Sequence, residues 1–108
     1  MNGKIVGVCA CPVGVAHTYM AADKFVSVAK KMGYEIKVET QGMSGIEDKL
    51  SDRDLKEADW IVLANDIALR EAERFEPYED KIIKTTMATV LHSTKEFIEE
   101  HLQEKGKV

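Results

Sequence analysis

The sequence predicts an α/β fold, a small doubly wound sheet of four parallel strands with helices on both faces. Three observations lead to this prediction. Apolar runs and segments of helical periodicity alternate along all 108 residues, as they do in sheets built from strand–helix–strand units. Two of the runs are continuously apolar, which is typical of central strands buried on both faces. Two others are amphipathic, which is typical of strands at the edges of a sheet.

The first half of the chain contains two predicted strands on either side of one helix. Residues 5–10 form a continuous apolar run rich in β-branched residues, so we expect the first central strand there. Apolar residues then recur at helical spacing over about 18–32, and Gly33 follows where a left-handed helix cap favours glycine. Residues 34–39 alternate strictly, which predicts a half-exposed edge strand. Residues 40–45 contain two glycines and are predicted to form a loop.

The middle of the chain contains a capped helix, a second buried strand and a further helix. Ser51 and Asp54 form a capping pattern for a short helix that ends at about residue 58. Residues 60–64 are continuously apolar and predict the second central strand. Residues 67–75 are expected to form a short helix that stops near Pro77, because proline lacks the amide donor.

The chain ends with a weak edge strand and its clearest helix. Residues 81–84 predict the strand. One face of the helix carries Met87, Val90, Leu91, Thr94, Phe97, Ile98 and Leu102. Right-handed crossovers, with the two apolar strands in the middle, give the strand order 2-1-3-4 of a small flavodoxin-like sheet. We expect a single domain over residues 1–103 and a frayed tail over residues 104–108.

Composition excludes several classes of protein. Fifteen Lys and Arg against nineteen Asp and Glu give a formal charge of −4, which argues against a nucleic-acid binder. No apolar run approaches the roughly 20 residues of a membrane helix, and no signal peptide is recognisable. Cys9 and Cys11 are too few and too close for a disulfide framework or a four-ligand zinc site. We therefore expect a cytoplasmic protein without a metal or cofactor and without direct membrane insertion.

The loop directly after the first strand carries the residues best suited to chemistry. Sheets of this kind bind ligands at the carboxyl ends of their strands. Cys11 stands there beside a helix start, where free amides and the helix dipole stabilise a thiolate. The same amides predict a cradle for a phosphate-like anion, with Pro12 fixing the chain and Gly14 allowing close approach. The predicted cradle consists of Pro12, Val13, Gly14, Val15, Ala16, His17 and Thr18.

A nucleophile at the rim of a phosphate cradle suggests a phosphocysteine intermediate. The alternative for a lone cysteine is a small buried hydrophobic residue, and we adopt that reading for Cys9, which lies inside the apolar run. For Cys11 the residues alone leave both readings open. Thr18 either caps the helix or donates to the anion, and His17 either binds phosphate or packs against backbone.

Two motifs resemble a known family. The string CPVGVAHTYMAA at residues 11–22, followed by VETQG at residues 38–42, resembles the cytoplasmic IIB component of the fructose type of the bacterial phosphoenolpyruvate-dependent sugar phosphotransferase system. The resemblance covers nearly the whole chain and includes Asp66 and the Arg74-Phe75 pair. Usual members read Cys-Pro-Thr-Gly-Ile-Ala-His-Thr, so Val13 here replaces a hydroxyl residue. That removes one side-chain donor but leaves the backbone cradle.

The resemblance implies a phosphoryl carrier. In that family the cysteine matching Cys11 accepts a phosphoryl group from a histidine of the IIA component. It then passes the group to a sugar, fructose or fructose-like, held by the membrane-embedded IIC component. The chain is therefore expected to be a phosphotransferase that associates peripherally with the membrane through IIC, and to be monomeric. Selectivity for the sugar belongs largely to IIC, so this sequence does not identify the sugar.

Two other functions stay open as alternatives. Low-molecular-weight phosphatases and arsenate reductases use a similar loop on a similar fold, and the phosphatases carry an arginine six residues after the cysteine. His17 occupies that place here, and histidine is a weaker, titratable donor that lacks the bidentate clamp. The other alternative is a thiol redox module that uses Cys9 and Cys11 together.

Four further residues are predicted at the same edge of the sheet. Glu39, Gln41 and Gly42 end the second strand, and there they either frame the site or contact a partner, or form only a polar turn. Asp66 ends the third strand and is either a site-edge residue or a helix N-cap. Tyr19 and Met20 either offer the partner an apolar contact or are buried. The charged residues 71–74 are interpreted as a solvated helix face.

Overall fold

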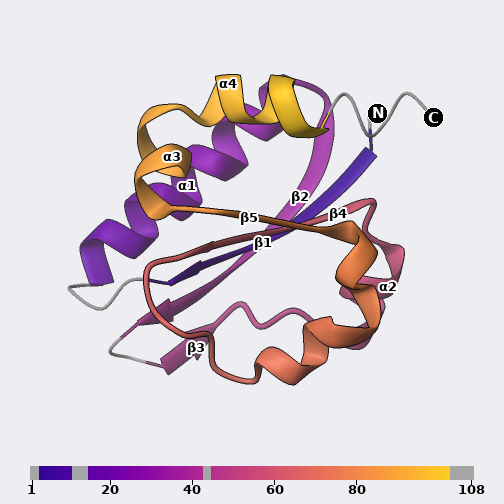
Figure 1. Cartoon of the computed structure of the whole chain (residues 1–108). Helices are drawn as coiled ribbons and strands as arrows, with labels where there is room; N and C mark the ends of the chain where they lie inside the picture. The colour runs from indigo at the N-terminus through magenta and orange to yellow at the C-terminus, as the bar shows by residue number, and fades with distance from the viewer. Residues whose placement is uncertain (1–2, 11–14, 43–44, 103–108) are drawn as a thin grey trace.

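A computed structural model of the chain has a five-stranded sheet at its centre, with helices on both faces (Figure 1). The structure describes residues 3–10, 15–42 and 45–102. The strands are β1 (Gly3–Ala10), β2 (Tyr34–Gly42), β3 (Gly45–Glu47), β4 (Trp60–Asn65) and β5 (Ile82–Thr85). Their order across the sheet is β3-β2-β1-β4-β5. The predicted α/β class is therefore confirmed.

The four parallel strands lie in the predicted order, and the prediction missed one further strand. β2, β1, β4 and β5 pair in parallel, which is the order 2-1-3-4 of the sequence analysis. The short β3 pairs antiparallel with β2 at the edge, from Thr40 opposite Glu47 to Gly42 opposite Gly45. The predicted loop over residues 40–45 is thus wrong in most of its length. Gly45 adopts φ +97°, a left-handed conformation that favours glycine at this hairpin.

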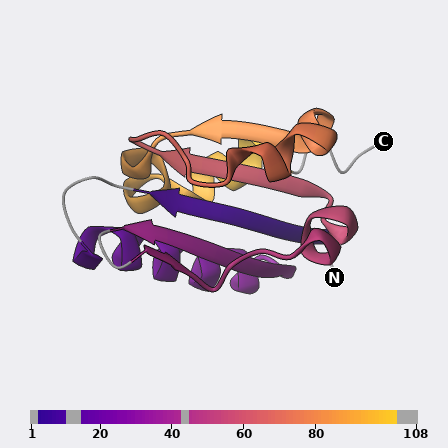
Figure 2. The same ribbon diagram turned by 90° about the horizontal axis from the view of Figure 1, so that it is seen from below.

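Helices cover the two faces of the sheet unequally (Figure 2). One face carries α1 (Val15–Lys31), α3 (Met87–His92), α4 (Thr94–Phe97) and the π-helical turn η2 (Ile98–Leu102). The other carries α2 (Asp52–Glu57) and the 3-10 segment η1 (Ala72–Lys81). Among the described residues no helix has both the length and the apolar character that crossing a bilayer requires.

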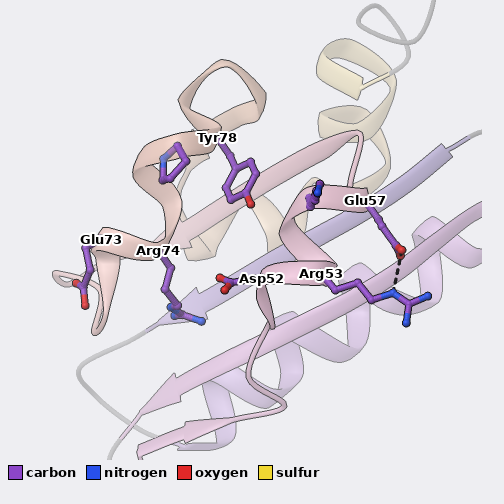
Figure 3. Close-up of a pocket in the computed structure, with 8 residues that line it drawn as sticks. Asp52, Arg53, Glu57, Glu73, Arg74 and Tyr78 are labelled. Atoms are coloured by element: carbon purple, nitrogen blue, oxygen red, sulfur yellow. Dashed lines mark hydrogen bonds and ion pairs between the residues drawn. The ribbon is translucent and has the colours of Figure 1, made fainter.

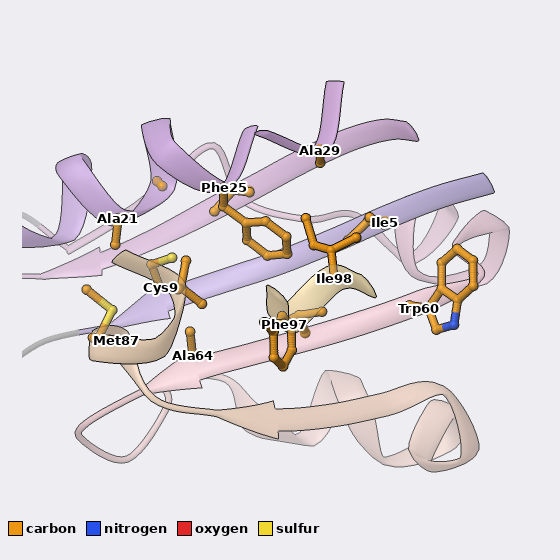
Figure 4. Packing of buried hydrophobic residues seen from close by; sticks show 14 of the residues in the cluster. Ile5, Cys9, Ala21, Phe25, Ala29, Trp60, Ala64, Met87, Phe97 and Ile98 are labelled. Carbon is orange, nitrogen blue, oxygen red and sulfur yellow. The ribbon is translucent and has the colours of Figure 1, made fainter. Parts of the chain in front are cut away.

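Each face of the sheet has its own hydrophobic cluster. The cluster under α1, α3 and α4 includes Ile5, Cys9, Ala21, Phe25, Trp60, Met87 and Phe97 (Figure 4). The cluster under α2 and η1 is Val6, Val8, Leu50, Leu55, Ala58, Ile61, Leu63 and Phe75. Successive residues of β1 alternate between these two clusters, as the period of a strand requires. Burial on both faces explains why the two central strands are continuously apolar.

Two of the predicted helices are confirmed, with small shifts at their ends. α1 begins at Val15, three residues before the predicted start, and Gly33 follows it with φ +89°. α2 has the predicted capping box: the Ser51 hydroxyl accepts from the Asp54 amide, and the Asp54 carboxylate accepts from the Ser51 amide.

The predicted helix over residues 67–75 is wrong over residues 67–71, and only its last four residues are helical, as the start of the 3-10 segment η1. The chain after β4 runs without regular structure to Glu71, which adopts φ +54°, and η1 begins only at Ala72. Nor does Pro77 end the helical segment, because η1 consists of two turns that meet at the non-helical Tyr78, directly after the proline. Hydrogen bonds from the side chains of other elements, described below, hold this irregular stretch in place.

The predicted last helix is broken into shorter pieces. Ser93 has φ −131° and ψ 38°, which separates α3 from α4, and the Thr94 hydroxyl donates to the Val90 carbonyl across the break. Such a local side-chain bond competes with the helical ladder. The apolar face nevertheless packs as predicted, with Val90 and Ile98 fully buried. The expected frayed tail over residues 104–108 lies outside the described residues.

Candidate functional site

The carboxyl ends of three neighbouring strands meet at the point where the predicted loop begins. Ala10, the last residue of β1, lies opposite Gln41 of β2 on one side and Asn65 of β4 on the other. Cys11, Pro12, Val13 and Gly14 lie outside the described residues, so their predicted roles stay predictions. The chain is described again from Val15, where the backbone enters α1. The first turn of a helix has amide groups without helical partners, as the predicted anion cradle requires.

Thr18 is the fourth residue of α1 and is buried. A helix cap stands ahead of the first helical residue. The capping role that was considered for Thr18 is therefore wrong, because the helix begins three residues earlier than predicted. Its other predicted role, as a donor to an anion, stays a prediction. Val15, Ala16 and His17 belong to the same first turn by their backbone.

Cys9 is a core residue, as predicted. It is fully buried between β1 and the helices above it, in the cluster that contains Ala64 and Met87 (Figure 4). Burial raises the pKa of its thiol to about 12, so a thiolate does not form near neutral pH. This environment argues against a redox pair of Cys9 and Cys11.

Glu39 is the centre of a buried polar network (the Glu39 network: Glu39, Gln41, Arg74 and the backbone of Leu50 and Arg70). The carboxylate is fully buried and receives two parallel bonds from Arg74, 2.8 Å from Nη1 to Oε1 and 2.9 Å from Nη2 to Oε2. Gln41 Nε2 donates to Oε2 at 2.7 Å, and the Leu50 amide donates to Oε1 at 2.8 Å. Burial by itself raises the pKa of Glu39, but these bonds outweigh it and lower the pKa below its ordinary value. Glu39 is therefore a charged group within the fold.

Gln41 extends this network to the segment after β4. Its Oε1 accepts from the Arg70 amide at 2.8 Å, and its Nε2 donates to the Arg70 carbonyl at 3.2 Å. Glu39 and Gln41 are both buried, so neither side chain has surface to offer a partner protein. The predicted contact with a partner is therefore wrong for Glu39 and Gln41. The alternative, that they form only a polar turn, is also wrong, because both residues lie in β2. Gly42 lies beside them at the strand end, with open space where a Cβ atom would stand.

Asp66 is tied directly to the end of β1. Its amide donates to the Ala10 carbonyl at 2.9 Å, and its Oδ1 accepts from the Met87 amide at the start of α3 over a longer 3.4 Å. The N-cap of α3 is Thr86, whose hydroxyl accepts from the Thr89 amide at 3.1 Å. The N-cap role considered for Asp66 is wrong, because the chain directly after it forms no helix, and its carboxylate instead accepts from the first residue of α3. Its side chain is exposed at the carboxyl edge.

Sequence reasoning placed Arg74 on a solvated helix face, and the structure corrects this. Only 12% of its side chain is exposed. Besides Glu39, the guanidinium bonds the carbonyl of Glu71 at 2.9 Å through Nε and that of Leu50 at 3.2 Å through Nη1. Glu39 was the signal in the sequence that could have indicated the burial of Arg74. A carboxylate on a strand that is covered on both faces needs a buried cation as its partner.

Two residues near the start of α1, Met20 and Tyr19, have side chains in different surroundings. The side chain of Met20 is 57% exposed, which rules out burial as its role. Tyr19 is half-buried, and its hydroxyl donates to Glu47 of β3. The tyrosine thus links α1 to the edge hairpin, and this hydrogen bond raises its pKa.

A groove of about 890 Å³ lies between α2 and η1 (Figure 3). Its lining is mostly charged and consists of Asp52, Arg53, Lys56, Glu57, Glu73, Arg74, Pro77 and Tyr78. Arg53 and Glu57 pair within it at 2.9 Å. Of the predicted site residues that the structure describes, none lines this groove. Within the described part of the chain, no three His, Cys, Asp or Glu side chains gather in a way that could hold a metal ion.

Comparison with known proteins finds relatives over most of the chain. A family model described as "PTS system, Lactose/Cellobiose specific IIB subunit" matches residues 6–100. The "PTS system fructose-like EIIB component 2" of Escherichia coli (strain K12) is 53% identical over 72 residues, which are 67% of this chain and 68% of that protein. The "PTS system fructose-specific EIIABC component" of Bacillus subtilis (strain 168) is 39% identical over 107 residues, 99% of this chain and 16% of that protein. A crystal structure of a domain from the fructose-specific IIABC component of Borrelia burgdorferi superposes with a TM-score of 0.82 at 45% identity and covers 91% of each chain.

Proposed function

This chain belongs to the fructose-type IIB components of the sugar phosphotransferase system, and on that premise we propose that Cys11 is its phosphoryl-carrying residue. IIB components are phosphotransferase domains that carry phosphoryl groups during sugar uptake and work with IIA and IIC components. The proposal rests on the position of Cys11 in the chain. This residue directly follows the end of the central strand β1, and α1 begins four residues later. Folds of this kind bind their ligands at that edge.

The proposed reaction consists of two in-line transfers. The Cys11 thiolate attacks the phosphorus of a phosphohistidine on IIA, an S–P bond forms, and the P–N bond breaks with the electron pair leaving on the histidine nitrogen. A sugar hydroxyl then attacks the phosphocysteine, an O–P bond forms, and the S–P bond breaks to return the thiolate while the hydroxyl proton is released to solvent. Positioning and charge stabilisation do most of the work in such transfers. Backbone amides from about Val13 to Thr18 hold the transferred oxygens.

The proposed partners follow from the same role. The donor is the phosphorylated IIA component, and the acceptor is a fructose or fructose-like sugar bound by the membrane component IIC. The chain acts from the cytoplasmic side as a monomer and reaches the membrane only through IIC. Phosphorylation adds roughly −1.5 to −2 charge at the carboxyl edge, and this change favours exchange of one partner for the other. The exposed Met20, in the second turn of α1, supports an apolar contact with IIA.

Transfer to Cys11 is tested by the mass of the intact protein. The chain is mixed with phosphoenolpyruvate, the general phosphotransferase enzymes and a fructose-type IIA. We expect one added phosphoryl group on the native protein and on Cys9→Ala, and none on Cys11→Ser, because a serine hydroxyl at neutral pH is a far weaker nucleophile than a thiolate. Cys9→Ala is the matched control, since it removes the other cysteine without placing a polar group in the core. Phosphorylation of Cys11→Ser would contradict the assignment.

A carrier must resist hydrolysis, and we expect the protein to be a poor phosphatase. His17 stands where the phosphatases have an arginine, so the bidentate clamp on the phosphoryl oxygens is absent from the loop. Turnover of an aryl phosphate is therefore expected at no more than about a thousandth of an ordinary enzyme rate of about 10 per second. A colorimetric assay at pH 6 to 7.5, with Cys11→Ser as the blank, measures it. Turnover near ordinary rates would favour the phosphatase alternative instead.

A further inference from the structure

The segment between β4 and η1 (the 66–71 segment) has no regular secondary structure and is fixed at both ends by bonds to other strands. At its start the Asp66 amide donates to the Ala10 carbonyl of β1 at 2.9 Å. At its end both backbone groups of Arg70 bond the side chain of Gln41 in β2. Glu71, the last residue, holds a left-handed backbone with φ +54°. Two further side-chain bonds hold the segment: Asn65 Nδ2 donates to the Ile67 carbonyl at 2.7 Å, and Arg74 Nη2 donates to the Arg70 carbonyl at 3.4 Å. A loop with so little internal structure takes its position from such bonds.

The carboxamide of Gln41 can be oriented in only one way. Its nitrogen lies 2.7 Å from a carboxylate oxygen of Glu39, and an ionised carboxylate only accepts hydrogen bonds. The NH₂ group must therefore face Glu39, and this leaves Oε1 to accept from the Arg70 amide. Arg74 in turn keeps Glu39 charged through its two parallel bonds. The Glu39 network thus sets which atoms of Gln41 are presented to the backbone of Arg70.

The other end of the 66–71 segment touches the peptide group that precedes the nucleophile. The carbonyl of Ala10 belongs to the peptide bond whose nitrogen is that of Cys11. A shift of Asp66 therefore acts on the orientation of that peptide plane, because the plane is rigid. Small displacements matter here: a misplacement of about 1 Å can slow a reaction about a hundredfold.

From these contacts we infer that Gln41 is a positioning residue for phosphoryl transfer, which holds the 66–71 segment so that Asp66 fixes the peptide group between Ala10 and Cys11. The inference rests on the proposed role of Cys11 and adds a residue to that site. Gln41 itself is buried. It acts through Arg70 and Asp66.

Gln41→Met tests the inference, because methionine fills similar space without donating or accepting these bonds. We expect the single-turnover rate of transfer from phosphorylated IIA to fall about tenfold or more, while the concentration of IIA at half-maximal rate stays the same. We also expect the pH midpoint of Cys11 alkylation by iodoacetamide to move upward in a Cys9→Ala background, because a thiolate out of line with the loop amides is less stable. A structural role remote from Cys11 would not move this midpoint.

Lys37→Met is the matched control. Lys37 lies on the same strand, and its substitution also removes a side-chain bond, 2.8 Å from Nζ to Asp54 Oδ2, but that bond leads to α2 and not to the 66–71 segment. We expect Lys37→Met to have the same transfer rate and the same pH midpoint of Cys11 alkylation as the wild type. If Gln41→Met does not fold, Gln41→Asn takes its place, since its side chain is too short to reach both partners.

The outcomes separate the inference from the proposed function. Native protein that phosphorylated IIA does not phosphorylate overturns the carrier role, and the alkylation profile then still tests the inference alone. Native protein that is phosphorylated, with a Gln41 variant that transfers at the wild-type rate, overturns the inference and leaves the carrier role intact. Equal slowing in Gln41→Met and Lys37→Met also overturns it.

Discussion

Arg74→Met is expected to lower the free energy of unfolding by about 3–5 kcal/mol, the usual effect of removing one partner from a buried ion pair. The substitution leaves the Glu39 carboxylate charged and fully buried, and among the described residues its remaining donors are Gln41 and the Leu50 amide. It also removes one of the bonds that the carbonyl of Glu71 accepts, the one from the guanidinium at 2.9 Å, and leaves the bond from the backbone amide of residue 74. Domains of this size are stabilised by only about 5–15 kcal/mol in total, so the variant is expected near the limit of folding at 37 °C. Urea denaturation followed by the fluorescence of Trp60 measures the loss.

Two variants control for the loss of an arginine as such. Arg53→Met removes an exposed arginine that pairs with Glu57 at 2.9 Å, and we expect its urea midpoint to match the wild type within error. Adding Glu39→Gln to Arg74→Met removes the unpaired charge, and the double variant is expected to be more stable than Arg74→Met alone. An Arg74→Met protein as stable as Arg53→Met would show that the pair contributes nothing, contrary to its burial.

The order of the parallel strands follows from the sequence because burial leaves a local trace. Residues 5–10 and 60–64 are apolar at every position, since helices cover both sides of β1 and β4. Residues 34–39 alternate, since β3 pairs with β2 only from Thr40 onward. Each of these patterns spans six residues or fewer and depends on no particular distant partner.

The features that escaped prediction depend on distant partners instead. The 66–71 segment is held by Gln41, which is 29 residues from Arg70 in sequence. Arg74 is fixed by Glu39 across 35 residues. A helical pattern over 67–75 could not compete with these bonds, and no local signal reports them. The strand β3 is equally invisible, since it has three residues and owes its existence to pairing with β2.

The candidate site divides in the same way. The place of Cys11 after a central strand is a property of the sequence and the fold class, so it could be predicted. The alternation of β2 also puts Glu39 and Gln41 on the face opposite Val38, and a doubly wound fold covers that face too. The burial of Glu39 could therefore have been predicted from the sequence. Its cationic partner could not, because three arginines follow Glu39 in the chain and no local pattern selects one of them.

The stability of Arg74→Met is expected to respond to acid in the opposite direction from that of the wild type. In the wild type the pKa of Glu39 lies below its ordinary value of 4.5, and the Lys37 ammonium together with the hydrogen bonds from Ser51 lowers the pKa of Asp54 from 3.8 to about 2. Both carboxylates therefore stabilise the fold fully above about pH 5 and lose their contributions as the pH falls through their folded pKa values. The contribution of these two carboxylates to the free energy of unfolding of the wild type should therefore be nearly constant from pH 7 to 5 and decline below pH 4.

In Arg74→Met the bonds from the guanidinium no longer offset the effect of burial on the carboxylate, and the pKa of Glu39 rises above 4.5. The charged carboxylate then destabilises the fold above that raised pKa, and protonation removes the penalty as the pH falls toward 4.5. The difference in stability from the wild type should consequently be greatest at pH 7 and shrink steadily on acidification. Urea midpoints of the two proteins at half-unit steps from pH 7 to 4 measure this difference, with the Glu39→Gln, Arg74→Met double variant as the reference that lacks the titrating group. A difference that stays constant over this range would mean that Glu39 finds another cation or water once Arg74 is gone, and that burial does not control its charge.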